Sequence, residues 1–272
     1  MKLYKFEITP LSSFITLPKG DILYGHILAY LYLMKEKNID EIKDNLVVSD
    51  MMPYGYFYRP NIPLKFFNEV DKKVLRKKRF ITLNSLQNNL EPEKIDFEYK
   101  EIVIKNSISR VSFTTSEGFD PYSIEEINYP KMWFFIKCKE DNFDSIKKAI
   151  DNISVYGFGK KSSIGKGRFE YKYEEYEFSQ IDTKYYLAIS PFIKDEKDKV
   201  WYDVYVKFGK YGLNKAKNSF KRPVVLCDSA SVIKLDTPQD IYGKILENGI
   251  GQDISYLQAK TILVPMKDLS CK

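Results

Sequence analysis

The sequence predicts an α+β fold made of two tandem domains. Apolar and charged residues alternate in several segments, which is the pattern of half-buried strands. Two segments in the first predicted domain instead carry apolar residues at helical spacing. The last third of the chain is rich in strand-like segments. With 272 residues, the chain has room for one large or two small domains with their own apolar cores.

The N-terminal elements are predicted to be a strand and a helix. Apolar and charged residues alternate over Tyr4–Ile8, which predicts the strand. We expect Asp21 to cap the helix that follows. Short strands are then predicted near Leu46–Val48 and Tyr54–Tyr58. The apolar residues at helical spacing in the helix are Leu23, Ile27, Leu31 and Met34.

We interpret residues 60–130 as a long insertion between two strands of one domain. A helix from Phe66 is predicted to run into the basic tract Lys72–Arg79. Asn84–Asn89 is expected to be a loop, and Ile102–Ile104 a strand. The insertion is therefore predicted to be a mixed hairpin and helical segment.

The pattern after the insertion completes the first domain. A strand is predicted over Met132–Cys138, a helix over Asn142–Asn152, and a further strand over Phe169–Tyr173 after the glycine-rich stretch Gly157–Gly167. Without the insertion the order is β-α-β-β-α-β, which is the ferredoxin-like pattern. In RNA-recognition modules this order presents a sheet to nucleic acid.

The acidic stretch Glu174–Asp182 is interpreted as the boundary, which gives domains 1–178 and 179–272. The second domain is expected to be a degenerate, strand-rich ferredoxin-like unit. Its predicted strands are Lys184–Ile189, Val200–Phe208, Pro223–Cys227, Ser231–Leu235 and Thr261–Pro265, and its predicted helices lie near Leu213–Phe220 and Pro238–Leu246.

Composition restricts the possible chemistry. The net charge is only +6, and the single histidine is His26, so any His-ligated metal site or Ser-His-Asp triad would have to use it. The three cysteines are far apart and show no C-x-x-C spacing, which argues against a zinc ribbon or a disulfide framework. We expect no metal and no cofactor. The chain shows no signal peptide and no long apolar span, so a cytoplasmic protein without membrane contact is expected.

The glycine-rich stretch is the most informative motif. Glycines permit positive φ and close backbone approach, and successive N–H groups in such turns can bind anions. Four cationic side chains accompany the four glycines, which suits a run of phosphates. The spacing differs from a Walker A loop, because Lys166 is followed by glycine rather than Ser or Thr. A tight helix-to-strand connection with solvated lysines is the alternative. The candidate residues are Gly157, Gly159, Lys160, Lys161, Ser162, Gly165, Lys166, Gly167 and Arg168.

Two other basic tracts add to this interpretation. Lys72–Arg79 carries six positive charges in eight residues, and Lys207–Arg222 mixes basic residues with aromatic ones. Such mixtures suit single-stranded nucleic acid, because phosphates pair with cations and bases stack on rings. Each tract alone could equally be a solvated face. The residues considered as further RNA or partner contacts are Arg76, Lys77, Lys78, Arg79, Lys215, Lys217 and His26.

Several motifs together resemble those of RAMP-superfamily CRISPR proteins, and more narrowly the fourth subunit of the type III-A effector, the Csm complex. The resemblance spans nearly the whole chain. In the second domain the usual Gly-Ser of that family is Ala230-Ser231 here, which is a departure. The motifs are Gly20–Gly25, Asn106–Arg110 ahead of Thr114-Thr115, Gly157–Gly167, Lys221–Val225 with Ala230-Ser231, and Tyr242-Gly243.

This resemblance implies a non-catalytic subunit that grips the 5′ repeat-derived handle of the CRISPR RNA. It also implies that the subunit joins the large polymerase-domain subunit to the backbone RAMP subunits. The part of the insertion near residues 60–100 would project as a hairpin toward guide RNA or a neighbouring subunit. By motif position, Asn106, Ser107 and Arg110 would contact bases of the handle.

Two alternatives remain open from the sequence. The first is an RNA-processing endoribonuclease of the same superfamily with His26 as general base. In those enzymes the glycine loop usually lies close to the C-terminus, whereas here over 100 residues follow it. The second is a protein-only interaction module, which predicts no RNA affinity at physiological salt.

Overall fold

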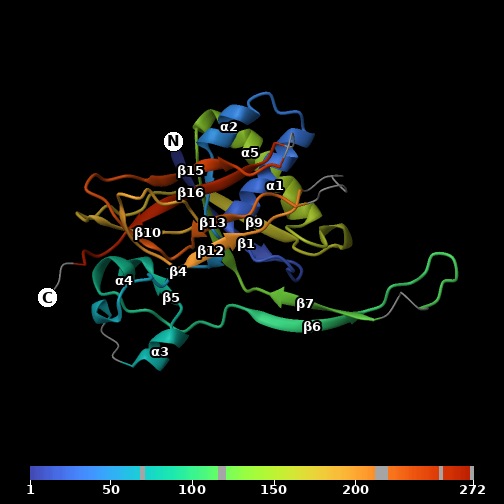
Figure 1. Ribbon diagram of the computed structural model, residues 1–272, viewed down its shortest axis with the longest axis horizontal. Helices are drawn as coiled ribbons and strands as arrows, with labels where there is room; N and C mark the ends of the chain where they lie inside the picture. Colours follow the sequence, from blue (N-terminus) through green and yellow to red (C-terminus); the bar gives the residue numbers. More distant parts are fainter. Residues whose placement is uncertain (68–70, 116–120, 212–219, 251–253, 270–272) are drawn as a thin grey trace.

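The computed structural model describes residues 1–67, 71–115, 121–211, 220–250 and 254–269 (Figure 1). Helices and strands are mixed along the chain, and the strands form two larger antiparallel sheets and three two-stranded ribbons. The predicted α+β class is therefore confirmed. None of the helices in the described ranges is long and apolar enough to cross a membrane.

The first sheet belongs to a β-α-β-β-α-β unit. Its strand order is β2-β8-β1-β9, with β3 also paired to β8. Helices α1 and α5 connect its strands as the periodicity predicts. Asp21 does not cap α1, because Lys19 is the N-cap residue and its side chain makes no capping bond. The bounds are β1 Lys2–Pro10, α1 Gly20–Leu33, α2 Ile39–Asn45, β2 Val47–Val48, β3 Met52–Pro53, β8 Met132–Cys138, the short 3-10 turn η2 Glu140–Asn142, α5 Phe143–Tyr156 and β9 Phe169–Glu175.

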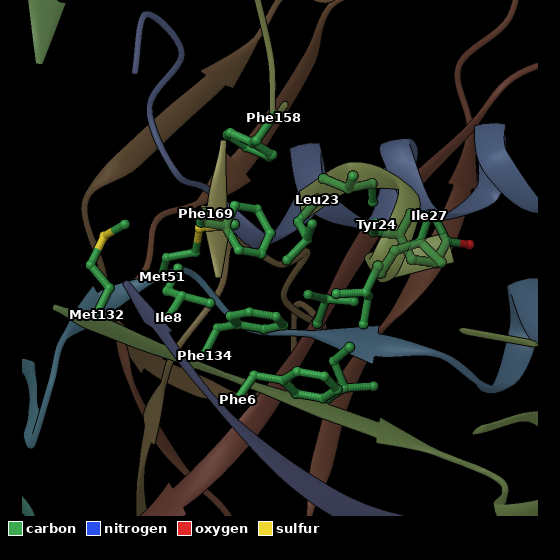
Figure 2. Packing of buried hydrophobic residues seen from close by; sticks show 14 of the residues in the cluster. Phe6, Ile8, Leu23, Tyr24, Ile27, Met51, Met132, Phe134, Phe158 and Phe169 are labelled. Carbon is green, nitrogen blue, oxygen red and sulfur yellow. The ribbon is translucent and has the colours of Figure 1, made fainter. Parts of the chain in front are cut away.

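One face of this sheet packs against α1 and α5 (Figure 2). Alternate residues of β1 point into this core, and Phe6 is fully buried with its ring 4.8 Å from that of Phe134. Leu23, Ile27 and Leu31 of α1 are buried as their spacing predicts. Burial of large apolar side chains is the main favourable term for folding, at about 1.5–3 kcal/mol each.

The opposite face of the first sheet is covered by the second sheet. A single apolar cluster joins the two sheets, so the first sheet is buried on both sides and is not presented to nucleic acid. The expectation taken from RNA-recognition modules is wrong in this respect, because the second sheet occupies that face. The cluster includes Leu3, Trp133 and Phe135 from the first sheet and Leu187, Val232 and Val264 from the second.

The second sheet has the order β11-β14-β10-β16-β15, and β12-β13 forms a separate ribbon. No helix occurs after β9 in the described part of the chain. The helix predicted near Pro238–Leu246 is wrong, since this segment is strand β15, and Val200–Phe208 is divided between two sheets. Most of Leu213–Phe220 lies outside the described residues. The bounds are β10 Tyr185–Ala188, β11 Lys199–Trp201, β12 Val204–Lys207, β13 Val224–Cys227, β14 Val232–Lys234, β15 Ile241–Glu247 and β16 Tyr256–Pro265.

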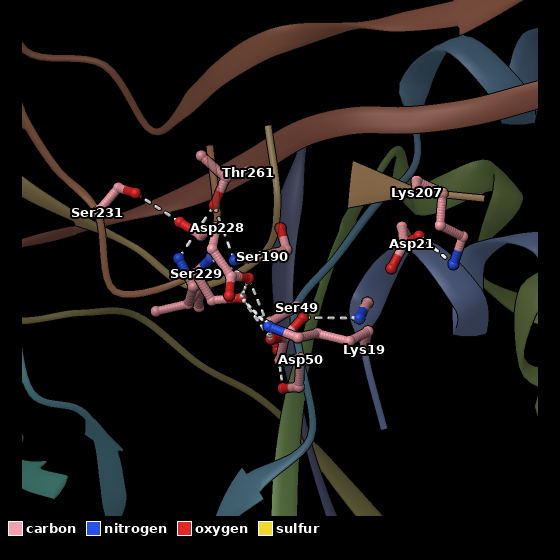
Figure 3. A network of polar contacts seen from close by, with 12 residues as sticks. Lys19, Asp21, Ser49, Asp50, Ser190, Lys207, Asp228, Ser229, Ser231 and Thr261 are labelled. Carbon is pink, nitrogen blue, oxygen red and sulfur yellow. Dashed lines mark hydrogen bonds and ion pairs between the residues drawn. The ribbon is translucent and has the colours of Figure 1, made fainter. Parts of the chain in front are cut away.

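Buried polar groups link the first domain to the C-terminal part of the chain. The Gln258 side-chain amide accepts a hydrogen bond from the Val48 N–H at 2.8 Å and donates one to the Val48 carbonyl at 2.7 Å. Figure 3 shows a second link, in which Lys19 Nζ lies 3.1 Å from Asp50 Oδ2 and 2.6 Å from Asp228 Oδ1. The division at residue 178 stays a prediction, because the two halves share one core.

The insertion forms a small subdomain and a long hairpin. Asn84–Asn89, for which a loop is predicted, lies mostly in helix α4, whose side chains are polar apart from two leucines. The helix expected from Phe66 is interrupted, with a 3-10 turn and the separate helix α3. The bounds are β4 Tyr56–Tyr58, η1 Leu64–Phe66, α3 Lys72–Lys77, β5 Phe80–Thr82, α4 Leu83–Asn88, β6 Tyr99–Lys105 and β7 Tyr122–Asn128.

The hairpin of β6 and β7 extends away from the body of the molecule (Figure 1). Its root is joined to the first domain by a bridge between Phe14 and Ile127, with hydrogen bonds of 2.8 Å in both directions. Beyond the root, Ile102 and Ile104 are 72% exposed, so this part of the ribbon lacks packing within the chain. A projecting hairpin is therefore present, but it is formed by β6 and β7 and not by the residues near 60–100 where it is expected, because much of that segment packs into a shared apolar cluster.

Candidate nucleic-acid interface

The glycine loop is closed at its base by backbone contacts. The Phe158 N–H donates to the Gly167 carbonyl at 2.8 Å. A Cβ on Gly157 would lie 2.1 Å from the Lys166 carbonyl oxygen, and one on Gly167 would lie 2.2 Å from that of Phe158. Glycine is required at both positions, because the two ends of the loop approach each other too closely for a Cβ. This agrees with the alternative in which the glycines form a tight helix-to-strand connection.

The loop docks on the segment that follows β1. The Gly167 N–H donates to the Ser13 carbonyl at 2.9 Å, and the Lys160 N–H donates to Thr16 Oγ1 at 2.8 Å. The Arg168 N–H donates to Ser12 Oγ at 2.9 Å. Residues 12–16 therefore hold the loop in place. The hydroxyls of Ser12 and Thr16 accept hydrogen bonds from backbone N–H groups of the loop and of Arg168.

The outer part of the loop is open. Lys161 has a φ of 65° and precedes the 3-10 turn η3 Ser162–Ile164, which Gly165 ends with a φ of 84°. A Cβ on Gly165 would meet nothing within 4 Å. The Ile164 N–H donates to the Lys161 carbonyl at 3.1 Å and the Gly165 N–H to the Ser162 carbonyl at 2.9 Å, which fixes the shape of this turn. Successive N–H groups in turns that contain left-handed residues can hold an anion.

The cationic side chains of the loop divide into two kinds. Lys160 and Arg168 are exposed, and Lys161 Nζ lies 5.7 Å from the ring centre of Tyr122 on the hairpin. Lys166 instead forms a short ion pair with Glu126 of β7. The sequence interpretation treats all four cations alike, but Lys166 is neutralised within the chain.

Glu126 is the centre of a buried polar cluster that the sequence does not identify. It accepts a hydrogen bond from the Ser13 hydroxyl at 2.6 Å and pairs with Lys105 Nζ at 3.2 Å, besides Lys166. The bonds from Lys166 and Ser13 lower the pKa of the Glu126 carboxyl to about 2. This cluster joins the glycine loop, the segment after β1 and the hairpin.

The hairpin places the motif residues beyond this cluster. Asn106 directly follows Lys105 at the end of β6, and both Asn106 and Arg110 are exposed, while Ser107 is half-buried. A turn held by the Ser109 carbonyl, which accepts from the Phe113 N–H at 2.9 Å, forms the outer end of the described hairpin. The loop therefore contacts β7 at Tyr122 and Glu126, and the motif residues follow Lys105, which is paired with Tyr122 across the hairpin.

His26 lies beneath the glycine loop. Its ring centre is 5.2 Å from that of Phe158, which is fully buried in the loop. Burial and the nearby charge of Lys207 lower the pKa of His26 to about 4, so the imidazole is neutral at pH 7. A neutral, packed imidazole supports the loop rather than contributing positive charge.

The other basic tracts lie elsewhere or are partly neutralised. Arg76, Lys77 and Lys78 belong to the end of α3, which Figure 1 shows well away from the outer part of the hairpin. Arg79 pairs with Glu98 at 3.1 Å. Lys207 pairs with the fully buried Asp21 at 2.6 Å. The candidates Lys215 and Lys217 lie outside the described residues.

No group of three or more potential metal-ligating side chains occurs in the described ranges. Cys138 and Cys227 are buried and free, and burial raises the pKa of the Cys227 thiol to about 11. Burial likewise raises the pKa of the Cys138 thiol, so both thiols are protonated at neutral pH.

Comparison with solved structures matches the fold along the whole chain. A chain of the Csm1-Csm4 cassette in complex with AMPPNP matches with a TM-score of 0.65 and 17% identity, covering 100% of both chains. A chain of the same cassette in complex with cA4 gives 0.66 at 17% identity. A chain of the Csm3-Csm4 subcomplex in the type III-A CRISPR-Cas interference complex gives 0.65 at 18% identity, covering 98% of this chain and 99% of that one. Csm4 is the subunit that these complexes share.

This chain has the Csm4 fold. The resemblance inferred from the motifs is confirmed at the level of the fold. No protein-family model and no curated protein matches the chain. The likeness is therefore carried by the three-dimensional structure, at low sequence identity.

Several motifs of the resemblance have a structural role in the Csm4 fold. A Cβ on Gly20 would lie 2.4 Å from the Val48 carbonyl oxygen, so glycine lets α1 begin against β2. A Cβ on Gly243 would lie 2.2 Å from the Ala259 carbonyl oxygen of the neighbouring strand. Ala230 has a φ of 72°, a conformation that glycine adopts without cost. The departure from Gly-Ser at this position therefore places a strained alanine in the chain.

Proposed function

We propose that the protein is a non-catalytic CRISPR-RNA-binding subunit of a type III-A effector complex, which holds the 5′ handle of the RNA. The observation that carries this proposal is the Glu126 cluster. It brings the glycine loop and the hairpin, which are far apart in sequence, onto one continuous surface. Together with the Csm4 fold, this surface supports a site for an extended, phosphate-rich ligand.

In this proposal the loop and the hairpin have different tasks. Lys160, Lys161 and Arg168, with the backbone of the loop, bind phosphates and position the RNA. Phosphate contacts of this kind carry little sequence information. Asn106, Ser107 and Arg110 contact bases that are turned out of the strand, as sequence-specific RNA recognition requires. Lys166 is assigned to the fold instead, because its charge is already paired with Glu126.

The partners follow from the solved complexes that share the fold. Csm4 is joined to Csm1 in one and to Csm3 in another. We infer that this chain likewise bridges a large polymerase-domain subunit and the first backbone RAMP subunit. The exposed apolar residues of the hairpin, Ile102 and Ile104, fit a segment that is covered in an assembly.

The absence of a catalytic role is supported by the state of His26. A general base works best when its pKa lies near the operating pH, and the pKa of His26 is lowered to about 4. Its ring packs on Phe158, below the loop rather than on its open side. We therefore do not propose the endoribonuclease function, and the experiment below includes the result that would support it.

The test is to express the full chain with a CRISPR array and the other effector subunits, and to isolate it by an affinity tag. We expect CRISPR RNA and the large subunit to co-purify, and Lys160→Ala with Lys161→Ala to reduce the bound RNA. The matched control removes the exposed Lys37 and Lys244, which lie outside the proposed surface. Purification without RNA in the presence of all subunits contradicts the proposal. Metal-independent cleavage of repeat RNA that is lost in His26→Ala would replace it with the endoribonuclease function.

A further inference from the structure

The ribbon of β12 and β13 carries apolar residues on its outer face. Val204 and Val206 of β12 and Val225 of β13 are 62%, 58% and 63% exposed. Val206 and Val225 are paired across the ribbon, so their side chains lie on the same face. The exposed rings of Phe208 and Phe220 continue this face beyond the two strands, with their centres 4.8 Å apart. These five residues are called the apolar ribbon face below.

The inner face of the ribbon contains the polar side chains of β12. Lys207 Nζ lies 2.6 Å from Oδ2 of the fully buried Asp21 at the start of α1 (Figure 3). The ring centre of Tyr205 lies 5.4 Å from Lys19 Nζ. Leu226, which is paired with Tyr205, is buried on the same side. Because these contacts hold the polar side against the body, the apolar side of β12 faces water, which is the reverse of an ordinary half-buried strand.

The apolar ribbon face is therefore a patch rather than a set of scattered residues. Single exposed apolar side chains are common on protein surfaces and need no explanation. Here the side chains are neighbours along one strand, across the ribbon and in a stacked ring pair. Contiguous exposed apolar side chains of this kind mark interaction sites.

The charge around the apolar ribbon face is positive. The described residues of the ribbon, 204–211 and 220–225, include lysines and an arginine but no carboxylate. Lys210 and Arg222 are exposed, and no carboxylate in the described part of the chain forms an ion pair with either. Lys210 Nζ lies 4.7 Å from the ring centre of Phe220, directly beside the apolar side chains. A surface that complements this face carries Asp or Glu next to its own apolar residues.

Two other occupants fit this face less well. Single-stranded nucleic acid needs rings on which bases can stack, whereas three residues of the face are valines and the rings of Phe208 and Phe220 already stack on each other. A second copy of this chain, docked through the same face, would bring the cations of two ribbons together without a carboxylate from either. We infer that the apolar ribbon face is a docking surface for another protein chain, which covers it with apolar residues bordered by Asp or Glu.

This inference rests on the proposed function, because its partner is sought within the effector complex. The complex is assembled from the full chain, the other effector subunits and a CRISPR array, with photoreactive p-benzoylphenylalanine in place of Val206. Light should cross-link this position to a protein segment with apolar residues bordered by Asp or Glu, which mass spectrometry identifies. The matched control carries the photoreactive group at Val155 of α5, which is 59% exposed and lies outside the ribbon. The control should not capture the same segment.

Two variants test the apolar and the charged contribution separately. Val206→Asp places a carboxylate against apolar side chains, so binding of the captured chain should weaken about ten-fold or more. Lys210→Glu with Arg222→Glu should slow association and reduce its dependence on salt. Exchanging the carboxylates of the captured segment for Lys should restore binding to this second variant. Unchanged affinity in both variants would contradict the inference.

RNA content separates this inference from the proposed function. Val206→Asp should leave the binding of handle RNA to the full chain unchanged in filter binding, because Val206 lies outside the proposed RNA surface. Cross-links from position 206 only to RNA, only to a second copy of this chain, or to nothing, in a complex that retains CRISPR RNA, overturn the inference and leave the proposed function standing. The expected cross-link in a complex without RNA contradicts the proposed function alone. A chain that purifies without RNA and without other subunits overturns both.

Discussion

Lys166 of the glycine loop and Glu126 of strand β7 form an ion pair that is largely withdrawn from water, with 21% and 6% of their side chains exposed. It joins two segments that both stand in the proposed RNA site. Because the pair is shielded, its removal should affect stability more than that of an exposed pair would. The pair also explains why the hairpin leaves the body beside the glycine loop.

The first prediction concerns the pH dependence that Glu126 creates. Its pKa is lowered to about 2 in the folded state, so the unfolded chain binds the proton first as pH falls. The stabilisation is present above pH 4.5 and is lost between about pH 4.5 and 2. Glu126→Gln should therefore destabilise the chain by about 2 kcal/mol at pH 7, with a smaller difference at pH 3.5. Urea unfolding at both pH values measures this, and a constant difference would contradict it.

A second prediction separates two glycines of the loop that share a positive φ. Gly157→Ala forces a Cβ to within 2.1 Å of the Lys166 carbonyl oxygen, whereas Gly165→Ala meets nothing within 4 Å. Gly165→Ala should cost only the left-handed backbone conformation, about 1–2 kcal/mol. Gly157→Ala should cost clearly more, because the loop base must also open. Thermal unfolding of both variants tests this, and equal losses of stability would show that close approach does not matter at Gly157.

The third prediction concerns Ala230, whose φ is 72°. Ala230→Gly removes a backbone cost of about 1–2 kcal/mol but makes the unfolded chain more flexible, by about 0.4–1 kcal/mol. A net gain of between about 0 and 1.6 kcal/mol is expected, seen as a higher melting temperature. Ala188→Gly is the control, since Ala188 lies in the ordinary strand β10 and its replacement should destabilise. A decrease in stability for Ala230→Gly would show that the methyl group contributes more than the strain costs.

The fourth prediction concerns His26. Its folded-state pKa is lowered from 6.5 to about 4 by burial and by Lys207, so the unfolded chain takes up the proton first. Stability from this group is therefore lost as pH falls from about 6.5 to 4, by about 2 kcal/mol. His26→Phe keeps an aromatic ring against Phe158 and removes the titration. The variant should gain stability relative to the natural chain between pH 7 and 4.5, measured by denaturant unfolding, and a gap that stays constant would refute the assignment.

The fifth prediction concerns the salt dependence of handle binding. Replacing Lys160 and Lys161 with Ala should reduce the slope of log affinity against log salt by about 0.7 for each phosphate that the variant no longer neutralises. Lys166→Ala should leave the slope nearly unchanged, because Lys166 is paired with Glu126. Filter binding at several salt concentrations measures both. An unchanged slope after replacement of Lys160 and Lys161 would remove the loop from the interface.

The sequence is most informative for elements that place alternate or helically spaced apolar residues on one core. Alternation predicts β1, β8 and β9, and helical spacing predicts α1 and α5, because each of them contributes such a set to the core of the first domain, although β8 is buried on both faces. Sequence patterns fail where tertiary contacts decide the structure. The segment of β15 is predicted to be a helix, although its pairing with β16 and the positive φ of Gly243 fix it as a strand.

Only part of the candidate site can be predicted from the sequence. Glycine spacing identifies the loop, and motif position identifies Asn106 and its neighbours. Glu126 gives no local signal, since its role depends on the register of the hairpin and on contacts with Ser13 and Lys166. The one weak sequence feature is that Glu126 shares its strand face with Ile124, two residues earlier, and directly precedes Ile127.

The paired hydrogen bonds between Gln258 and Val48 have a consequence for how this protein can be divided. The Gln258 side-chain amide bonds both backbone polar groups of Val48 in β2. It thus takes the place of an adjacent strand at this position. A fragment that ends near residue 178 would lose this neighbour and would also expose Leu3, Trp133 and Phe135 to water. Neither half is then a self-sufficient unit, and truncations meant to isolate the RNA-facing part should yield aggregating material.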